Sequence, residues 1–272
     1  MTAEPTRYSV DDPGTIQGRD EVFLDERSLA ALRLQRALAA IPETSGRLLL
    51  PGAGAGRYAR AFARYRPAWD IVAGDLSAQA IEEARALGSG PEYHVFDAEQ
   101  IPFEDQSFDA LIFLDLIEHL PHPARFLAEC RRVLTPDGVL HGFSPLEAAS
   151  GTLYHVFGND RPVPIHRWKR EHVGHVQRFN TPGLLQLLWD AGFEPYEIDY
   201  SFHLLGQTHD VLDYWARERV SGGQGRMPVS AVRAITRLAF IATWRLSYLE
   251  DRLYSGPSFA SGIHITARSS SK

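Results

Sequence analysis

The feature that most constrains the fold of this chain is the alternation of short apolar runs with helical patterns between residues 47 and 200. Apolar runs of this length are typical of buried strands, and they lie at 47–50, 70–74, 92–96, 108–114, 139–144 and 193–200. Strands that alternate with helices are joined by right-handed crossovers, which produce a mostly parallel sheet covered on both faces. We therefore predict a doubly wound α/β fold.

The segments around these strands carry the signals of helices. We predict helices over residues 25–40, 57–65, 77–87, 123–134 and 181–191. Ser77 can cap the third helix, and Thr181 before Pro182 predicts an N-cap for the last one. Alternating apolar residues at 262–268 predict a final strand.

Two stretches fall outside this alternation. Residues 145–180 are too many for an ordinary loop between a strand and a helix, and they are rich in aromatic and basic residues. Residues 203–256 hold a helical pattern, a flexible Ser-Gly-Gly-Gln-Gly stretch at 221–225 and a long amphipathic helix over 229–253. We expect these insertions to form a lid over the strand ends, and residues 1–20 to form an irregular arm.

The composition excludes several classes of protein. With 44% hydrophobic and 23% charged residues the chain is typical of globular proteins, and its net charge of -6 argues against a general nucleic-acid binder. The single cysteine, Cys130, can form neither an intramolecular disulfide nor a thiolate zinc cluster, which fits a reducing compartment. We see no signal peptide and no apolar stretch of about 18 residues, so we expect a cytoplasmic protein without a membrane span.

Polar and small residues follow three successive predicted strands. The turn Gly52–Gly56 follows the first strand with the spacing GxGxG, and Arg57 stands where the dinucleotide fingerprint has its third glycine. Asp75 ends the second strand, where a carboxylate can accept both ribose hydroxyl protons. Asp97 and Ala98 end the third strand, where they can meet an adenine. Because ligands bind at the carboxyl ends of parallel strands, these residues predict a nucleoside-like ligand.

The chain from about residue 48 to residue 144 resembles the class I S-adenosylmethionine-dependent methyltransferases. The resemblance rests on LLLPGAGAGRYARAFA, VAGDLSAQAIEEAR and FDAEQIPFEDQSFDALIFLDLIEHLPHPARFLAECRRVLTPDGVL, and FNTPGLLQLLWDAGFEPYEIDY extends it. It implies the cofactor S-adenosylmethionine and a Rossmann-like, seven-stranded sheet whose last strand is antiparallel. It also implies one domain over 1–272, with a cover (1–46), a cofactor core (47–144 and 181–202), insertions (145–180 and 203–256) and a last strand and tail (257–272).

The resemblance implies a set of cofactor contacts at the glycine turn and the next three strand ends. They are Gly52, Ala53, Gly54 and Gly56 under the methionine part, Asp75 and Leu76 at the ribose, Asp97 and Ala98 at the adenine, and Leu114 and Asp115 at the methionine end. One position departs from the family. Leu50 stands where these enzymes usually have Asp or Glu two residues before the first glycine. The contact to the methionine amino group is therefore supplied elsewhere, or cofactor affinity is reduced.

His119, with Asp115 close by, is the candidate catalytic residue. Methyl transfer from a sulfonium needs mainly positioning, and a base is needed only if the acceptor must lose a proton. A histidine after the fourth strand suits that role, although it can equally cap and orient the following loop. Asp115, Glu118 and His119 are also similar to the ExxEH metal site of some ubiquinone-pathway and small-RNA methyltransferases. A bare Glu-His pair recurs in metal-free relatives, so we expect no metal.

The insertion at 145–180 supplies candidate substrate contacts. These are His155, His166, Trp168, His172 and His175, which would face an anionic or phenolic acceptor. The basic run at 165–170 could instead bind nucleic acid, or lie as a solvated loop. The helix over 229–253 could lie on a membrane, cover the active site or form a homodimer contact.

These observations lead to one expected function and two alternatives. We expect an S-adenosylmethionine-dependent methyltransferase that acts on a small organic acceptor, preferably at oxygen, with no nucleic-acid partner. The alternatives are an RNA or protein methyltransferase and a non-catalytic S-adenosylmethionine-binding scaffold. The departure at Leu50 keeps the scaffold open as an alternative.

Overall fold

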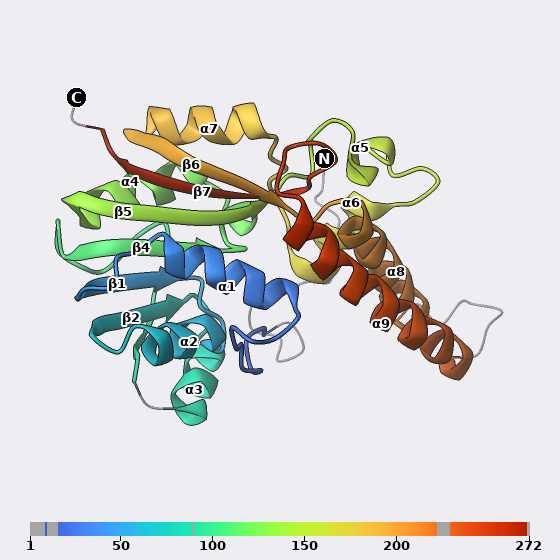
Figure 1. Cartoon of the computed structure of the whole chain (residues 1–272), viewed down its shortest axis with the longest axis horizontal. Coiled ribbons are helices and arrows are strands. Elements are labelled where there is room, and N and C mark those ends of the chain that lie inside the picture. Colours follow the sequence, from blue (N-terminus) through green and yellow to red (C-terminus); the bar gives the residue numbers. More distant parts are fainter. Residues whose placement is uncertain (1–8, 10–15, 89, 222–228, 271–272) are drawn as a thin grey trace.

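The computed structural model describes residues 9, 16–88, 90–221 and 229–270. Its described residues form a seven-stranded sheet from β1 (Gly46–Pro51), β2 (Trp69–Asp75), β3 (Glu92–Val95), β4 (Phe108–Leu114), β5 (Leu134–Pro145), β6 (Phe193–Ser201) and β7 (Gly262–Ser269). The order is β3-β2-β1-β4-β5-β7-β6 (Figure 1), with parallel pairing from β3 to β5 and β7 antiparallel to both its neighbours. The predicted doubly wound, mostly parallel fold with an antiparallel last strand is confirmed.

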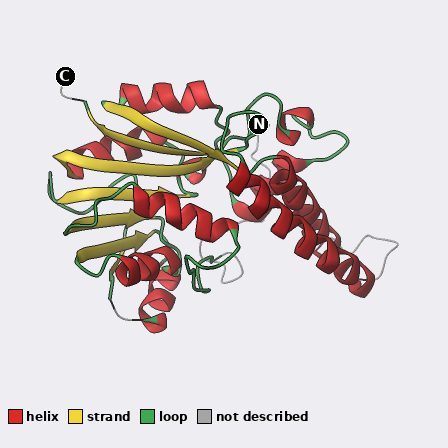
Figure 2. Cartoon of the chain, viewed as in Figure 1, coloured by secondary structure: helices red, strands yellow, loops and turns green. Residues whose placement is uncertain are grey.

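Helices lie on both faces of the sheet and beyond one of its ends (Figure 2). They are α1 (Leu29–Ala39), α2 (Arg57–Tyr65), α3 (Ala78–Leu87), a short 3-10 turn (Ile117–His119), α4 (Pro123–Val133), α5 (Leu153–Val156), α6 (Ile165–Val173), α7 (Thr181–Asp190), α8 (Leu204–Ser221) and α9 (Val229–Leu253). Most of the predicted helices are therefore present near their predicted bounds.

Strand β1 shows how the sheet is buried on both faces. Leu48 and Leu50 pack with residues of α1, α2 and α3 on one face, and Leu49 packs with residues of α4 and α7 on the other. All three leucines are buried. A strand covered on both faces has to be apolar at successive positions, which explains why this run shows no alternation in its sequence.

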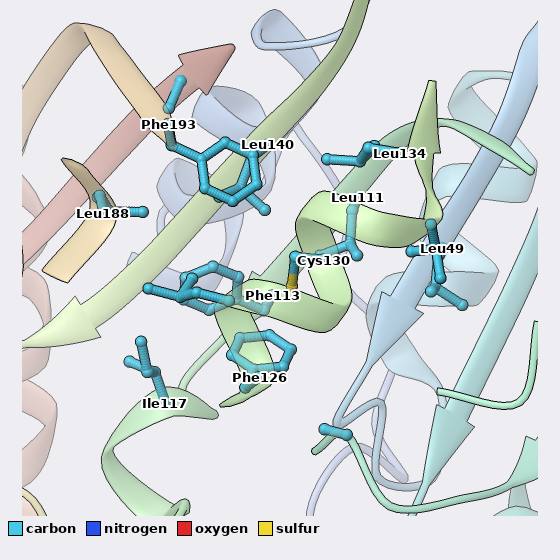
Figure 3. Close-up of a cluster of buried hydrophobic side chains, with 14 of the residues drawn as sticks. Leu49, Leu111, Phe113, Ile117, Phe126, Cys130, Leu134, Leu140, Leu188 and Phe193 are labelled. Atoms are coloured by element: carbon cyan, nitrogen blue, oxygen red, sulfur yellow. The ribbon is translucent and has the colours of Figure 1, made fainter. Parts of the chain in front are cut away.

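Figure 3 shows the core on the face covered by α4 and α7. The rings of Phe113 on β4 and Phe126 on α4 meet edge to face, with centroids 5.2 Å apart, and Cys130 is buried in the same cluster. Gly142 on β5 leaves space for this packing, because a Cβ there would lie 2.2 Å from the Phe113 ring. The absence of a side chain at Gly142 therefore leaves room for the Phe113 ring of the neighbouring strand β4.

Two predicted starts are wrong by a few residues. β5 begins at Leu134 and not at residue 139, because Leu134 already pairs with Phe108 across an irregularity of the β4–β5 register. The first helix begins at Leu29, after the irregular residues 25–28, because the Ser28 side chain caps it. An inter-strand pair sets the first boundary and a side-chain cap sets the second, and the apolar pattern reports neither.

The cap of α7 also differs from the prediction. Asn180, not Thr181, is the N-cap, since its side-chain oxygen accepts the Gly183 N–H at 2.9 Å. Thr181 and Pro182 are the first residues of the helix, where the missing N–H of proline costs no intrahelical bond.

The insertion at 145–180 contains two helices, α5 and α6, whose positions the sequence did not predict. α5 is a single turn of four residues, and α6 buries Ile165, Trp168 and the charged Lys169. In the apolar pattern a lysine is counted as a surface residue, although Lys169 is buried. The pattern therefore did not predict α6.

Helices α8 and α9 pack side by side and extend beyond the end of the sheet (Figure 1). At their base the buried His203 Nδ1–H donates to Asp251 Oδ1 at 2.7 Å, and Asp251 also accepts the Phe202 N–H at 2.8 Å. The predicted flexible stretch at 221–225 lies outside the described residues except for Ser221, which ends α8. Of the predicted arm, the described residues 9 and 16–20 have no regular structure.

Among the described residues, none of the helices has the length and hydropathy that crossing a bilayer requires.

Two buried histidines on the strands β5 and β7 make the stability depend on pH. His141 and His264 are 2% and 3% exposed, and burial together with Arg36 lowers the pKa of His141 to about 3. In the unfolded chain a histidine titrates near pH ~6.5. At a pH between these two pKa values, His141 is protonated in the unfolded state and neutral in the folded state. The free energy of unfolding therefore falls as the pH falls.

We predict that the His141→Asn variant loses less stability in acid than the wild type does. From pH 6 to pH 4 the difference in unfolding free energy between the two should change by about 1.4 kcal/mol per pH unit, because one titrating group is removed. Urea unfolding at several pH values measures this. The partly exposed His94 provides the control variant His94→Asn, and parallel pH profiles for His141→Asn and wild type would contradict the prediction.

Candidate cofactor and acceptor site

The glycine turn between β1 and α2 is enclosed on two sides. Gly52, Gly54 and Gly56 have φ values of +69°, +54° and +85°, which favour glycine. A Cβ at Gly54 would lie 2.6 Å from the carbonyl oxygen of Gln17, and one at Gly52 would lie 2.7 Å from Leu116. The turn therefore lies between the N-terminal segment and the end of β4, and it tolerates no larger residue.

Asp75, at the end of β2, fixes the glycine turn. Its Oδ2 accepts the Gly54 N–H at 2.8 Å, and its Oδ1 accepts the Ser77 N–H at 2.9 Å. The neighbouring Leu76 side chain is 56% exposed, which is unusual for leucine. A carboxylate beside exposed apolar surface fits a ribose with its attached base.

The end of β3 lies beside the end of β2, because Asp75 pairs with Val95 and the Phe96 N–H donates to the Asp75 carbonyl. Asp97 is exposed and its Oδ1 accepts the Glu99 N–H at 2.9 Å, while Ala98 is buried. The three strand ends that the sequence singled out thus lie along one edge of the sheet. Their glycines, carboxylates and apolar surface fit an adenosyl ligand.

At the end of β4, Asp115 adopts a left-handed backbone with φ +54°. Its N–H donates to the carbonyl oxygen of Phe143 at 3.2 Å, and its carboxylate forms an ion pair with Arg33 of α1. Arg33 stacks over the Phe143 ring, 3.8 Å from its centroid. Arg33 could not be identified from the sequence, because it is one of several arginines on an amphipathic helix.

Glu118, on the 3-10 turn after β4, is a buried carboxyl group. It is 1% exposed, and neither of its side-chain oxygens has a hydrogen-bond partner. Burial, with the nearby charges of Asp115 and Glu147, raises its pKa well above the ordinary value. Its carbonyl oxygen accepts the N–H groups of Val176 and Gln177, both at 2.9 Å. The insertion therefore fixes the backbone of Glu118, and its buried side chain is suited to carry a proton or to bind a cation.

Two imidazoles face this carboxyl group. The Nε2 atoms of His119 and His175 lie 3.9 Å and 4.0 Å from Glu118 Oε1, and the two rings meet edge to face at 4.8 Å. His119 Nδ1 lies 3.3 Å from the carbonyl oxygen of Gly174, and His175 Nδ1 bonds to the Glu147 carboxylate. Because both partners accept, both Nδ1 atoms carry hydrogen.

Burial and the neighbouring His175 lower the pKa of His119 to about 4. His119 is therefore neutral at physiological pH. The side-chain donor atoms of Glu118, His119 and His175 lie within 4.8 Å of one another, and we call these three residues the Glu118 cluster.

Glu147, in the loop after β5, connects the Glu118 cluster to the cap, by which we mean residues 146–180 together with α8. It is 2% exposed and lies 3.3 Å from His166 Nδ1 and 3.4 Å from Lys169 Nζ, in addition to its bond with His175. Burial alone would raise the pKa of Glu147, but Lys169, His166 and His175 lower it well below its ordinary value. Glu147 is thus a charged centre around which the cap folds.

The same network reaches α8. Lys169 Nζ lies 3.3 Å from Asp210 Oδ2, and the Tyr154 hydroxyl donates to that carboxylate at 2.7 Å. The Lys169 ammonium also lies 4.2 Å from the centroid of the Tyr154 ring. The sequence did not indicate this network, because its members are far apart in the chain and read as surface residues.

The five predicted substrate residues lie in different surroundings. His175 belongs to the Glu118 cluster, and His155 is exposed on α5. His166 is buried with both ring nitrogens bonded, to Glu147 and to the Tyr154 carbonyl. Trp168 is 5% exposed inside the cap, and His172 Nε2 lies 3.4 Å from Glu218. Of these side chains, the structure brings His175 to the end of β4.

Comparison with known proteins supports the interpretation that the strand ends fit an adenosyl ligand. Residues 49–141 match the family model described as a methyltransferase domain, which is about a third of the chain. The chain is 35% identical over 96 residues to a ubiquinone/menaquinone biosynthesis C-methyltransferase of Desulfotalea psychrophila, covering 35% of this chain and 39% of that protein. It is 28% identical over 181 residues to a ubiquinone biosynthesis O-methyltransferase of Neisseria meningitidis, covering 61% and 72%.

The fold has solved counterparts. The crystal structure of the [4+2]-cyclase SpnF superposes with a TM-score of 0.57 at 23% identity, covering 93% of this chain and 85% of that one. At this identity the likeness concerns the fold alone. Residues 49–141 match a methyltransferase domain, and the described residues share the fold of a solved putative methyltransferase of Bacillus halodurans at 22% identity, with a TM-score of 0.56 and covering 88% of this chain and 98% of that one.

Proposed function

We propose that this protein uses S-adenosylmethionine to methylate a small organic acceptor, at an oxygen atom. The observation that carries the proposal is the position of the Glu118 cluster. Glu118 and His119 lie on the turn that follows β4, next to the glycine turn, and the insertion brings His175 to them. The likeness to O- and C-methyltransferases of ubiquinone biosynthesis supports a small acceptor.

S-adenosylmethionine, when bound, supplies an electrophilic methyl group. The glycine turn would hold its methionine part, Asp75 and Leu76 its ribose, and Asp97 and Ala98 its adenine. An acceptor hydroxyl must lose its proton as the oxygen takes up the methyl group. We propose that His175 Nε2 accepts this proton, because the Glu147 carboxylate on its Nδ1 stabilises the imidazolium that forms.

In this proposal His119 and Asp115 keep roles near the acceptor, but neither is the main base. The pKa of about 4 makes His119 a weak proton acceptor, so we propose that it helps to position the acceptor and does not take the proton. The Asp115 carboxylate is paired with Arg33.

The charges of the cap favour a small acceptor over a nucleic acid. Lys169, in the middle of the basic run 165–170, is buried between Glu147 and Asp210. Arg167 lies 3.3 Å from Glu218. A nucleic-acid groove presents exposed cations to phosphates, and these two cations are neutralised within the cap.

A second candidate function follows from two observations. The cyclase SpnF shares this fold, and Leu50 replaces the acid that usually contacts the cofactor. The protein would then bind S-adenosylmethionine without transferring its methyl group. Transfer of a labelled methyl group to any acceptor distinguishes the two functions.

The Glu118 cluster also fits a divalent metal ion, with one carboxylate and two imidazole ligands. His175, and not Asp115, completes the set, because Asp115 is engaged with Arg33. A metal bound there would lower the pKa of an acceptor hydroxyl and take over the role of the base.

The first prediction concerns cofactor binding. Asp75→Ala should weaken S-adenosylhomocysteine binding about tenfold or more, because charged hydrogen bonds to the ribose are each worth ~1.5–3 kcal/mol and the glycine turn loses its anchor. Isothermal calorimetry measures the affinity. The matched control is Asp70→Ala, on the same strand but paired with Arg47 at its other end, and it should bind like the wild type. Equal affinities of all three proteins would refute the assignment.

The second prediction concerns the reaction. In a cell extract, methyl groups labelled on S-adenosylmethionine should enter small molecules, and treatment with RNase should change nothing. With the acceptor identified, His175→Ala should lower kcat about 100-fold, as expected for the loss of a general base, while S-adenosylhomocysteine affinity stays unchanged.

The control variant for this experiment is His209→Ala, on α8, which should keep full activity. Label that enters RNA or protein would refute the small acceptor, and His175→Ala with undiminished kcat would refute the base.

The third prediction concerns metal binding. Calorimetric titration with Mn²⁺ or Zn²⁺ should show one site in the wild type and none in Glu118→Gln, because the neutral amide removes the anionic ligand. His209→Ala should bind like the wild type. Activity that is lost in EDTA and restored by the ion would assign the proton step to the metal, and activity indifferent to EDTA would leave it with His175.

A further inference from the structure

Helix α9 is fixed to the protein through one of its sides. Thr243, Ser247 and Asp251 recur there every four residues, so they lie in one row along the helix. The Thr243 hydroxyl lies 2.7 Å from His209 Nδ1 of α8, and the Asp251 carboxylate bonds to His203 at the base of α8. Ser247 and Asp251 are buried. This row therefore forms the inner side of α9, which packs on α8.

Another side of α9 is exposed to solvent, and we call it the outer face. Its residues are Ile241, Ala242, Arg245, Leu246, Leu249, Arg252 and Leu253. The apolar residues from Ala242 to Leu253 recur at intervals of three or four, which keeps them on one side of the helix. Leu246 and Leu249 are 47% and 48% exposed, and Leu253 is 84% exposed. A row of large exposed apolar side chains indicates a surface that binds a partner.

Two arginines lie beside this apolar row. Arg245 and Arg252 are both exposed, and because they are seven residues apart they lie on the same side of the helix. The Arg252 guanidinium donates to the Tyr248 hydroxyl at 2.9 Å, and this partner is uncharged. The outer face thus combines apolar area with positive charge.

The acids of α9 do not lie on the outer face. Residues 229–249 contain three arginines and no Asp or Glu. The two acids near the end of the helix bond to the beginning of α8. Glu250 Oε2 accepts the Leu205 N–H at 2.8 Å, and Asp251 pairs with His203. Among the described residues the outer face of α9 is therefore positive, although the whole chain has a net charge of -6.

This combination of side chains favours a lipid surface over a second copy of the chain. In a two-fold contact between outer faces with antiparallel helices, the arginines of one copy would approach those of the other, and like charges repel. At a lipid surface the leucines can enter the boundary between headgroups and acyl chains. The long arginine side chains can then reach the phosphates of the headgroups. Helices α8 and α9 extend beyond the sheet (Figure 1), so a flat surface can reach them.

We propose that the outer face of α9 binds the surface of a membrane that contains anionic phospholipids. The helix lies in the plane of that surface and keeps its inner side on α8. Because α8 belongs to the cap, this contact holds the cap near the lipid. The proposed surface is independent of the proposed function, since it involves none of the residues assigned to the cofactor or the acceptor.

Co-sedimentation of the full chain with lipid vesicles tests this proposal. One preparation contains phosphatidylcholine alone, and the other contains phosphatidylcholine mixed with phosphatidylglycerol. The wild type should bind the mixed vesicles about tenfold more tightly than the neutral ones, because each arginine near an anionic surface adds to the attraction. Added salt should weaken this binding, because it screens the attraction.

Two double variants separate the charged from the apolar contribution. Arg245→Gln combined with Arg252→Gln should weaken binding to the mixed vesicles about tenfold and remove most of its salt dependence. Leu246→Ser combined with Leu249→Ser should weaken binding by a similar factor at every salt concentration, because less apolar area enters the lipid. Since all four side chains are exposed, both variants should unfold at the wild-type temperature.

Arg125→Gln and Leu87→Ser are the matched controls. Arg125 is exposed on α4, and Leu87 is 47% exposed at the end of α3. Each control removes the same kind of side chain as a double variant does, but from another helix. Both controls should bind the mixed vesicles like the wild type.

Three results would overturn the proposal: a wild type that does not bind the mixed vesicles, double variants that bind them like the wild type, or controls that lose binding equally. A dimer that light scattering detects without lipid, and that Leu246→Ser with Leu249→Ser dissociates, would assign the outer face to a contact between copies instead. Affinity for S-adenosylhomocysteine is measured without lipid. Its absence would therefore overturn the proposed function and leave the lipid-binding surface standing.

Discussion

The buried charge of Glu147 is the constraint on which the packing of the cap depends. A carboxylate removed from water costs several kcal/mol unless cations and donors replace the lost hydration. Here Lys169, His166 and His175 surround it, and they come from α6 and from the segment after it. The cap can cover the sheet only in a conformation that brings these three groups to Glu147. The requirement for charge compensation therefore also delivers His175 to the Glu118 cluster.

The sequence predicted the sheet and the clustering of its strand ends around the proposed cofactor site, and the reason is physical. Buried parallel strands are apolar at successive positions, so Leu48 to Leu50 stand out, and the glycines and Asp75 follow directly in the chain. The cap and the Arg33–Asp115 pair depend on long-range contacts, which the periodicity of apolar residues does not predict. Lys169 looks like a surface residue until Glu147 and Asp210 are seen beside it, and Arg33 looks like any arginine of an amphipathic helix. Local signals predict elements, whereas long-range ion pairs appear only in the folded chain.

The match to the family model ends at residue 141, just before the cap begins. Residues 49–141 hold the glycine turn and the ends of β2, β3 and β4, which are the parts that we propose to meet the cofactor. Beyond them lie the loop with Glu147, the cap and the helices α8 and α9. A fold shared with C- and O-methyltransferase relatives and with a cyclase leaves the chemistry to be decided in these segments.

The place of β7 in the sheet bears on how the chain assembles. β7 follows every other described element in the sequence, yet it lies between β5 and β6 and pairs with both. While the chain is being made, β1 to β5 can pair as soon as they have left the ribosome, but β6 has no partner strand until residues 262–269 are present. The part of the sheet from β1 to β5 can therefore form first, and β6 joins the sheet in one of the last steps of folding.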